Sequence, residues 1–283
     1  MRDDLDLKSL EDTPPWDWPA DAAEKFQEIL TNRQADESDR LIAAELAGDF
    51  TVINDELAAS LMAIIRNPEE SEQLRALAAI SLGPVLEHAE TSGFEDPDDV
   101  PITEETFLNI QVFLRKLYFD NNVPKEVRRR ILEASVRSPD DWHPDAIRAA
   151  YNSGDRDWVL TAVFSMRFVR GFEEQILEAL KSADPEIHYE AVEAAGTWEV
   201  AAAWPHVVAL VEDTTTPKTL LLAAIGAVAS INPAEAGMIL VDLTDSDDEE
   251  IVEAAHEAMA MAEVGSGGDY DEEEEEDEDE WLN

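Results

Sequence analysis

Histidine is the side chain of this sequence best suited to metal binding and acid–base chemistry, because the chain contains no cysteine. Disulfides, thiolate nucleophiles and cysteine-based metal sites are thereby excluded. The histidines are His88, His143, His188, His206 and His256, and they show neither the HExxH spacing nor a recurring pair. We therefore predict that they converge on no catalytic or metal site, and we expect no cofactor and no enzymatic activity.

Other chemical motifs are missing as well. The glycine-rich stretch "GSGG" at residues 265–268 precedes acidic residues and lacks the lysine of a phosphate-binding P-loop. The 66 aspartates and glutamates are so numerous that close carboxylate pairs will arise by chance. No acid–base site can be argued from them.

Charge is distributed unevenly along the chain. The net charge is −46, which disfavours nucleic acid and anionic membranes as partners and favours a basic protein. More than half of the 20 lysines and arginines lie between Arg115 and Arg170, and none follows Lys218. The acidity with few lysines resembles proteins of salt-loving cells, although a strongly hydrated surface explains it equally simply.

Three consecutive arginines, Arg128, Arg129 and Arg130, form the most basic stretch, "VPKEVRRRILEASVR". On a helix the stripe of Val127, Ile131 and Ala134 faces inward, so at least some of the arginines face solvent. Two interpretations stay open: these bases pair with acids of neighbouring helices, or they form a patch that binds an acidic peptide.

The elements that position these residues follow from an internal repeat. Similar segments begin at Ile187 ("IHYEAVEAAG"), Thr219 ("TLLLAAIGAV") and Ile251 ("IVEAAHEAMA"), each 32 residues after the last. Related segments begin at Leu74, Val127 and Trp158. Small residues dominate the positions four and seven residues after each start, namely Ala78 and Ser81, Ile131 and Ala134, Ala162 and Ser165, Ala191 and Ala194, Ala223 and Gly226, and Ala255 and Ala258. On a helix these positions share one face, which predicts close helix packing.

Each repeat continues into a second apolar segment, so the unit is a pair of antiparallel helices that must stack on its neighbours. The segment "DPEIHYEAVEAAG" (184–196) resembles the HEAT-like repeat of the PBS-lyase type, over about residues 36–263. The resemblance implies an all-α, right-handed solenoid of six or seven helix pairs. His188, Val159 and Val252 stand where this family has arginine. Deoxyhypusine hydroxylases, iron enzymes of this class, carry several His-Glu pairs, whereas only His256-Glu257 matches here.

Three regions are expected. Residues 1–35 form a cap in which Trp16, Trp18 and Phe26 cover the open end of the solenoid, or else a docking peptide. Residues 36–263 form the solenoid, with a loop insertion near 91–104 that is either functional or merely tolerated. Residues 264–283 form a flexible acidic tail.

The acidic run of the tail is followed by two apolar residues, Trp281 and Leu282. Aromatic residues concentrate binding energy at interfaces. The tail could therefore dock on another protein that has a basic surface and an apolar pocket, or fold back on the basic stretch between Arg115 and Arg170. It could also serve solubility alone.

These features predict a non-enzymatic scaffold or adaptor that holds a protein or peptide partner, with basic proteins among the candidates, on a concave surface built from the second helices. The tail would steer or gate binding. Candidate contacts are Arg128, Arg129, Arg130, Trp142, Trp158, Trp198, Trp204, Trp281 and Leu282. The alternatives are an enzyme or subunit of the bilin-lyase type, and an acidic chaperone or nucleic-acid mimic. No signal peptide or membrane span is visible, so we expect a cytoplasmic protein.

Overall fold

The computed structural model describes residues 7–96 and 99–266, and every regular element within these ranges is a helix. The predicted all-α helical-repeat fold is thereby confirmed. Trp281 and Leu282, with most of the predicted tail, lie outside the described residues. The last helix runs to Ser266, so the first residues assigned to the tail belong to it.

The chain divides into two compact units, Met1–Phe172 and Glu173–Asn283. The repeats in the sequence do not predict this boundary. Each unit consists of stacked helix pairs and is described by itself, and the hand of the solenoid stays a prediction.

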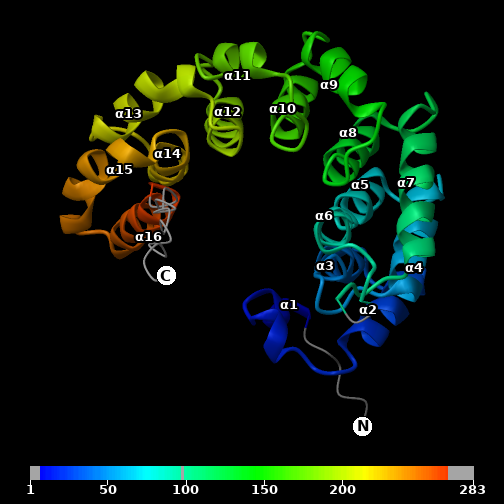
Figure 1. The fold of residues 1–283 in the computed structure, drawn as a ribbon. Helices are drawn as coiled ribbons and strands as arrows, with labels where there is room; N and C mark the ends of the chain where they lie inside the picture. Colours follow the sequence, from blue (N-terminus) through cyan, green and yellow to red (C-terminus); the bar gives the residue numbers. More distant parts are fainter. Residues whose placement is uncertain (1–6, 97–98, 267–283) are drawn as a thin grey trace, which may run out of the picture. The chain divides into compact units, whose positions relative to one another are not determined.

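Ten α-helices lie in the described part of the N-terminal unit (Figure 1), and five of them begin with a side chain that accepts a hydrogen bond from the first turn. They are α1 (Leu7–Glu11), α2 (Ala22–Thr31), α3 (Glu37–Leu46), α4 (Asp55–Arg66), α5 (Glu72–Ile80), α6 (Gly83–Ser92), α7 (Glu104–Tyr118), α8 (Lys125–Ser135), α9 (His143–Tyr151) and α10 (Arg156–Ser165).

The helices of this unit form two rows. Helices α3, α5, α8 and α10 pack side by side in one row, and α2, α4 and α7 pack in the other. The apolar segment 74–90 is divided between α5 and α6. Pro84 lies in the first turn of α6, where backbone N–H groups have no acceptor within the helix, so a proline costs no hydrogen bond there. The additional helix α6 packs on α8.

The N-terminal segment packs only in part as predicted. Phe26 is completely buried, and Trp18 meets its ring edge to face at 5.7 Å. The indole N–H of Trp18 donates to the carbonyl of Thr13 at 2.8 Å. Trp16, however, is 79% exposed, so the expectation that it covers the end of the solenoid is wrong.

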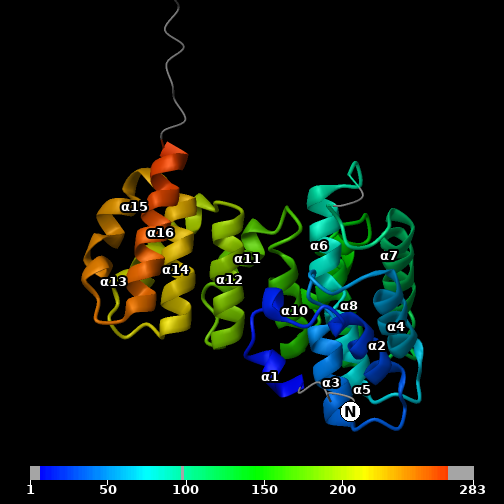
Figure 2. The same ribbon diagram turned by 90° about the horizontal axis from the view of Figure 1, so that it is seen from below.

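The C-terminal unit repeats the same arrangement with α11 (Glu173–Ala179), α12 (Pro185–Thr197), α13 (Trp204–Glu212), α14 (Lys218–Ile231), α15 (Pro233–Leu240) and α16 (Glu249–Ser266). Within this unit α12, α14 and α16 form one row, which lies on the inner side of the unit's curve (Figures 1 and 2). The second helices α13 and α15 lie on the outer side, so the expectation that they build a concave surface is wrong here.

The predicted stripe of small residues is buried at every position except Gly226, which is exposed. Ala224 and Ala227 are buried instead, because the register assumed for the segment at Thr219 is displaced by one residue. Ala227 packs against α12 so closely that a Cβ at Gly196 would lie 3.2 Å from the Cβ of Ala227. The packing rule is therefore confirmed and its register corrected.

Candidate functional site

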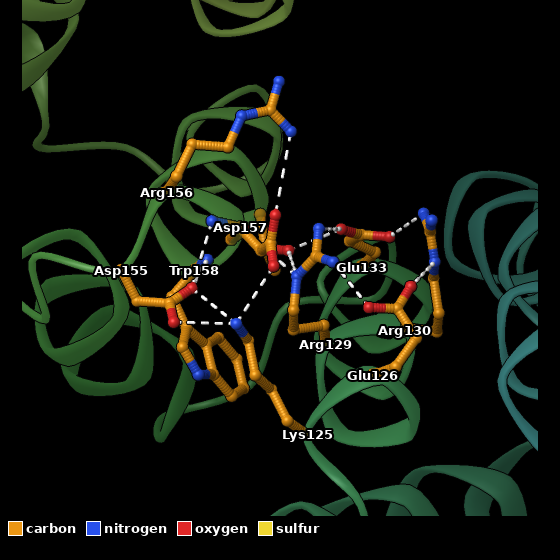
Figure 3. A network of polar contacts seen from close by, with 10 residues as sticks. Lys125, Glu126, Arg129, Arg130, Glu133, Asp155, Arg156, Asp157 and Trp158 are labelled. Carbon is orange, nitrogen blue, oxygen red and sulfur yellow. Dashed lines mark hydrogen bonds and ion pairs between the residues drawn. The ribbon is translucent and has the colours of Figure 1, made fainter. Parts of the chain in front are cut away.

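A network of charged side chains joins α8 to α10 in the N-terminal unit (Figure 3). At the solvent edge the Lys125 ammonium donates to both carboxylate oxygens of Asp155 at 2.7 Å and to Asp157 at 3.0 Å. Hydrogen bonds from Lys125 lower the pKa of both carboxyls below their ordinary value. Asp155 also caps α10 by accepting from the backbone N–H of Trp158.

Arg129 forms the buried part of this network and is only 5% exposed. Its guanidinium donates to Glu126 at 2.6 Å and to the Thr161 hydroxyl at 2.9 Å. Thr161 in turn donates to Glu133 at 2.6 Å, and Arg130 donates to the same carboxylate at 2.7 Å. Each buried charge is thus balanced by an opposite charge or a hydrogen bond. The network fixes α8 against α10.

Arg128, the neighbouring base, packs against aromatic rings instead of carboxylates. Its guanidinium carbon lies 5.6 Å from the ring centre of Tyr118 and 5.6 Å from that of Trp158. No carboxylate of the described residues forms an ion pair with it, and its buried Nε–H finds no acceptor. Aromatic rings stabilise a cation but accept no strong hydrogen bond from it. The N–H groups of Arg128 therefore keep their capacity to bind a carboxylate.

Aromatic residues from three more elements surround this arginine. Tyr118, at the end of α7, packs on Trp142 at 5.0 Å and on Trp158 at 6.3 Å. Phe119 contacts both Tyr118 and Trp142, at 5.1 and 5.5 Å, yet is 58% exposed. Burial raises the pKa of the Tyr118 hydroxyl, partly offset by the Arg128 charge, so the group stays neutral. We call Tyr118, Phe119, Arg128, Trp142 and Trp158 the aromatic clamp.

His143 packs against Trp142 of the clamp. Its ring lies 3.9 Å from the ring of Trp142, its Nδ1 accepts from the Asp140 backbone N–H at 2.8 Å, and its Nε2 lies 3.0 Å from the Ser135 hydroxyl. Burial lowers the pKa of His143 to about 4, so the ring is neutral at pH 7. It is a positioning residue for Trp142.

An exposed apolar stripe runs along α7 toward the clamp. Leu108 is 50% exposed, Val112 69% and Phe119 58%. Residues spaced in this way lie on one side of a helix. Arg115 lies on the same side and pairs with Asp140 at 3.3 Å, while Lys116 beside it has no ion pair among the described residues. The clamp and the stripe form one amphipathic surface.

The structure brings together Arg128, Trp142 and Trp158 from the predicted contact set, although Trp142 is nearly buried. Arg129 and Arg130 are engaged by Glu126 and Glu133, so they do not form an anion-binding patch with Arg128. Trp198 and Trp204 belong to the C-terminal unit, at the end of α12 and the start of α13. Trp281 and Leu282 lie outside the described residues.

Sequence analysis missed Tyr118, Phe119, Leu108 and Val112. The signal was present in "EETFLNIQVFLRKLYFD", where apolar residues occupy more than one side of a helix. Such a helix cannot bury all of them against a single neighbouring layer.

Two of the histidines meet although the sequence shows no pairing between them. The Nε2 atoms of His188 (α12) and His206 (α13) lie 2.7 Å apart. Burial lowers the pKa of both rings, and the nearby His206 lowers that of His188 further. Within the described residues no group of three or more histidine, aspartate or glutamate side chains could hold a metal ion.

No protein-family model matches the chain. No curated protein matches it. Among solved structures it is similar to human deoxyhypusine hydroxylase in complex with glycerol, at 14% identity and a TM-score of 0.41 over 91% of this chain and 88% of that one. It is also similar to the Escherichia coli protein YibA, at 17% identity and a TM-score of 0.46 over 92% and 93% of the two chains. A third is a designed armadillo repeat protein in complex with the peptide (KR)4, at 15% identity and a TM-score of 0.34 over 84% and 98%.

Because these identities and TM-scores are low, neither an activity nor a partner follows from the similarities. In the described part of the chain no helix is both long and apolar enough to cross a membrane.

Proposed function

We propose that this protein is a non-enzymatic scaffold that binds a peptide segment of a partner protein on the aromatic clamp and the α7 stripe. The observation that carries the proposal is Arg128, a half-buried cation held between two aromatic rings with no carboxylate partner among the described residues. A group buried in this way costs free energy unless a ligand supplies the missing partner. The neighbouring exposed Phe119 offers an apolar contact to the same ligand.

The chemistry of the surface defines the segment. A carboxylate would accept hydrogen bonds from Arg128, and apolar side chains would cover Phe119 and Val112. Charge-assisted hydrogen bonds contribute about 1.5–3 kcal/mol, and burial of an apolar side chain contributes a similar amount. Because association also loses translational and rotational entropy, two such contacts support a specific but weak complex. The partner segment is therefore acidic and carries aromatic or aliphatic residues.

The proposal is tested with short fluorescent synthetic peptides that combine acidic or basic residues with a Trp-Leu pair, or carry the acids alone. Fluorescence polarisation measures their binding to the full-length protein. We expect the acidic peptide with Trp-Leu to bind best. Arg128→Gln should weaken it at least about tenfold, because about 1.4 kcal/mol corresponds to a factor of ten in Kd.

Matched controls are available in the same unit. Phe50 is 56% exposed, close to the 58% of Phe119, so Phe50→Ser is the control for Phe119→Ser. Arg66 is an exposed arginine on α4, so Arg66→Gln is the control for Arg128→Gln. Binding that responds equally to Phe50→Ser and Phe119→Ser would contradict the proposed site. Preferential binding of the basic peptides, independent of Arg128, would instead support the acidic-chaperone alternative.

A further inference from the structure

Helix α7 has a regular pattern on its exposed side. Leu108, Val112, Arg115 and Phe119 are all exposed, and they follow one another at intervals of four, three and four residues. In a coiled coil, a helix contacts its partner through residues at this spacing. The guanidinium of Arg115 is already bonded to Asp140, so this arginine offers a partner mainly its methylene groups. The stripe therefore has the form of a seam for a further helix.

The two ends of this seam carry charges of opposite sign. Glu104 and Glu105 lie in the first turn of α7, and neither has an ion pair among the described residues. At the other end, Lys116 lies in the last turn of α7 and Arg128 packs on Tyr118. These two bases also lack an ion pair in the described part of the chain. The seam is thus acidic where α7 begins and basic where it ends.

We propose that the partner segment is an amphipathic α-helix that packs antiparallel to α7, with acidic residues in its first turn and basic residues in its last turn. This inference rests on the proposed function and adds the conformation and the direction of the ligand. In the antiparallel direction the first turn of the ligand meets Lys116 and Arg128, and its last turn meets Glu104 and Glu105. Apolar residues at coiled-coil spacing cover the stripe between these ends.

The helix macrodipole favours the same direction. Acids in the first turn and bases in the last turn stabilise the ligand's own helix, because they complement its dipole. A parallel ligand would need bases in its first turn and acids in its last turn to match α7, and this distribution destabilises a helix. The antiparallel ligand alone satisfies both requirements.

The length of the seam sets the length of the ligand. From Leu108 to Phe119 the helix axis rises by about 16 Å, at about 1.5 Å per residue. A ligand helix of about 12–18 residues covers this distance together with the charged ends. Isolated helices of this length are marginally stable in water, so the ligand should gain helix content when it binds.

The test uses the full-length protein and three fluorescent designed peptides of about 18 residues with the same apolar residues at coiled-coil spacing. The first peptide has glutamates in its first turn and lysines in its last turn, and the second has these charges exchanged. A lactam bridge on the outward side gives both the same helix content, which circular dichroism checks. The third peptide is an unbridged copy of the first with a proline at a central outward position, which breaks the helix.

Fluorescence polarisation measures the binding of each peptide. We expect the first peptide to bind at least about tenfold more tightly than either of the others, which is about 1.4 kcal/mol. Val112→Ser and Phe119→Ser should each weaken it several-fold, while the control Phe50→Ser should not. Glu104→Gln/Glu105→Gln should reduce its preference over the second peptide, because the lysines of its last turn lose their partners.

Several results would overturn the inference. They are no binding of the first peptide, equal binding of the proline peptide, equal or tighter binding of the charge-exchanged peptide, and binding that does not respond to Val112→Ser. An unchanged preference in Glu104→Gln/Glu105→Gln would also overturn it, since α7 would then not determine the direction. The proposed function fails separately, when no acidic peptide depends on Arg128. Equal, Arg128-dependent binding of helical and proline-containing peptides keeps the function and excludes the helical ligand.

Discussion

In each unit a lysine–carboxylate contact at the surface joins the first helices of two successive helix pairs, α8 to α10 and α14 to α16. The contacts in the interior differ between the two units. Lys125 begins α8 and bonds Asp155 and Asp157, at the start of α10, at 2.7 and 3.0 Å. Lys218 begins α14 and bonds Asp248 and Glu250, at the start of α16, at 2.7 and 2.6 Å. Both lysines follow a proline. The shared contact marks equivalent positions in two repeats.

Aligning the two lysines pairs Arg128 with Leu221 and Trp158 with Ile251. Arg128 and Trp158 thus have aliphatic counterparts in the C-terminal unit, where helices of the same kind stack without an arginine between aromatic rings. Stacking therefore does not require an arginine between two rings. The comparison supports our proposal that the clamp serves binding, whereas the packing beneath it serves the fold.

The largest expected effect is the removal of Arg129. Arg129→Met should reduce the stability of α8 and α10 by about 3–5 kcal/mol, because it leaves the buried Glu133 without one of its partners. Hydrogen exchange of these helices in the full-length protein measures the change. The double variant Arg129→Met/Glu133→Met should recover much of the loss, since the equivalent positions of the C-terminal unit, Leu222 and Gly226, carry no charge. A loss as large in the double variant would contradict this explanation.

Protonation of His143 should give the N-terminal unit a pH-dependent stability. The pKa of His143 falls from 6.5 to about 4 on burial, so the unfolded chain binds more protons between these values. Stability therefore decreases as pH falls from about 6.5 to about 4, by up to about 3 kcal/mol. Hydrogen exchange of α8 and α9 should show this slope. His143→Gln, which cannot titrate, should remove it, while the pH dependence of α12 and α13, where the pKa values of His188 and His206 are also lowered, should remain.

Much of this architecture could be predicted from local patterns. The spacing of small residues located the first helices, because close helix packing demands small side chains at fixed intervals. The single-residue error at Gly226 arose because the long apolar run 220–229 does not define one register by itself. Contacts with the neighbouring repeats, such as that of Ala227 with Gly196 and that of Lys218 with Asp248, fix that register.

The site was predicted less well, for a physical reason. Whether Arg128, Arg129 or Arg130 is neutralised depends on which acids the next helix presents, and this is a tertiary property. Sequence analysis identified Arg128 and Trp158 but could not foresee that they meet over Tyr118. The contact between His188 and His206 was not predicted, because the two residues lie on different helices and meet only in the folded chain.

A smaller effect is expected in the C-terminal unit from its closest helix approach. Gly196→Ala places a methyl group 3.1 Å from the Cα of Ala227 and should destabilise α12 and α14 by about 1–3 kcal/mol through overpacking. Gly226→Ala, in the same unit, meets nothing within 4 Å and should stabilise α14 by about 0.5–1 kcal/mol. Chemical denaturation or hydrogen exchange compares the two. If both variants shifted stability in the same direction, the corrected register would be wrong.

The smallest effect should be the same in both units. Lys125→Met and Lys218→Met each remove a surface contact that is exposed to solvent, and such contacts contribute little. Hydrogen bonds from these lysines lower the pKa of Asp155 and of Asp248, so the contribution is complete above about pH 4 and is lost as the carboxyls protonate below it. Salt of about 1 M should remove it as well, because the Debye length is then about 3 Å. An equal, salt-sensitive shift in the two variants, measured by thermal denaturation, would show that the lysine contact is a general property of the repeat. A salt-resistant shift confined to Lys125→Met would instead mean that this lysine is coupled to the Arg129 network beneath it.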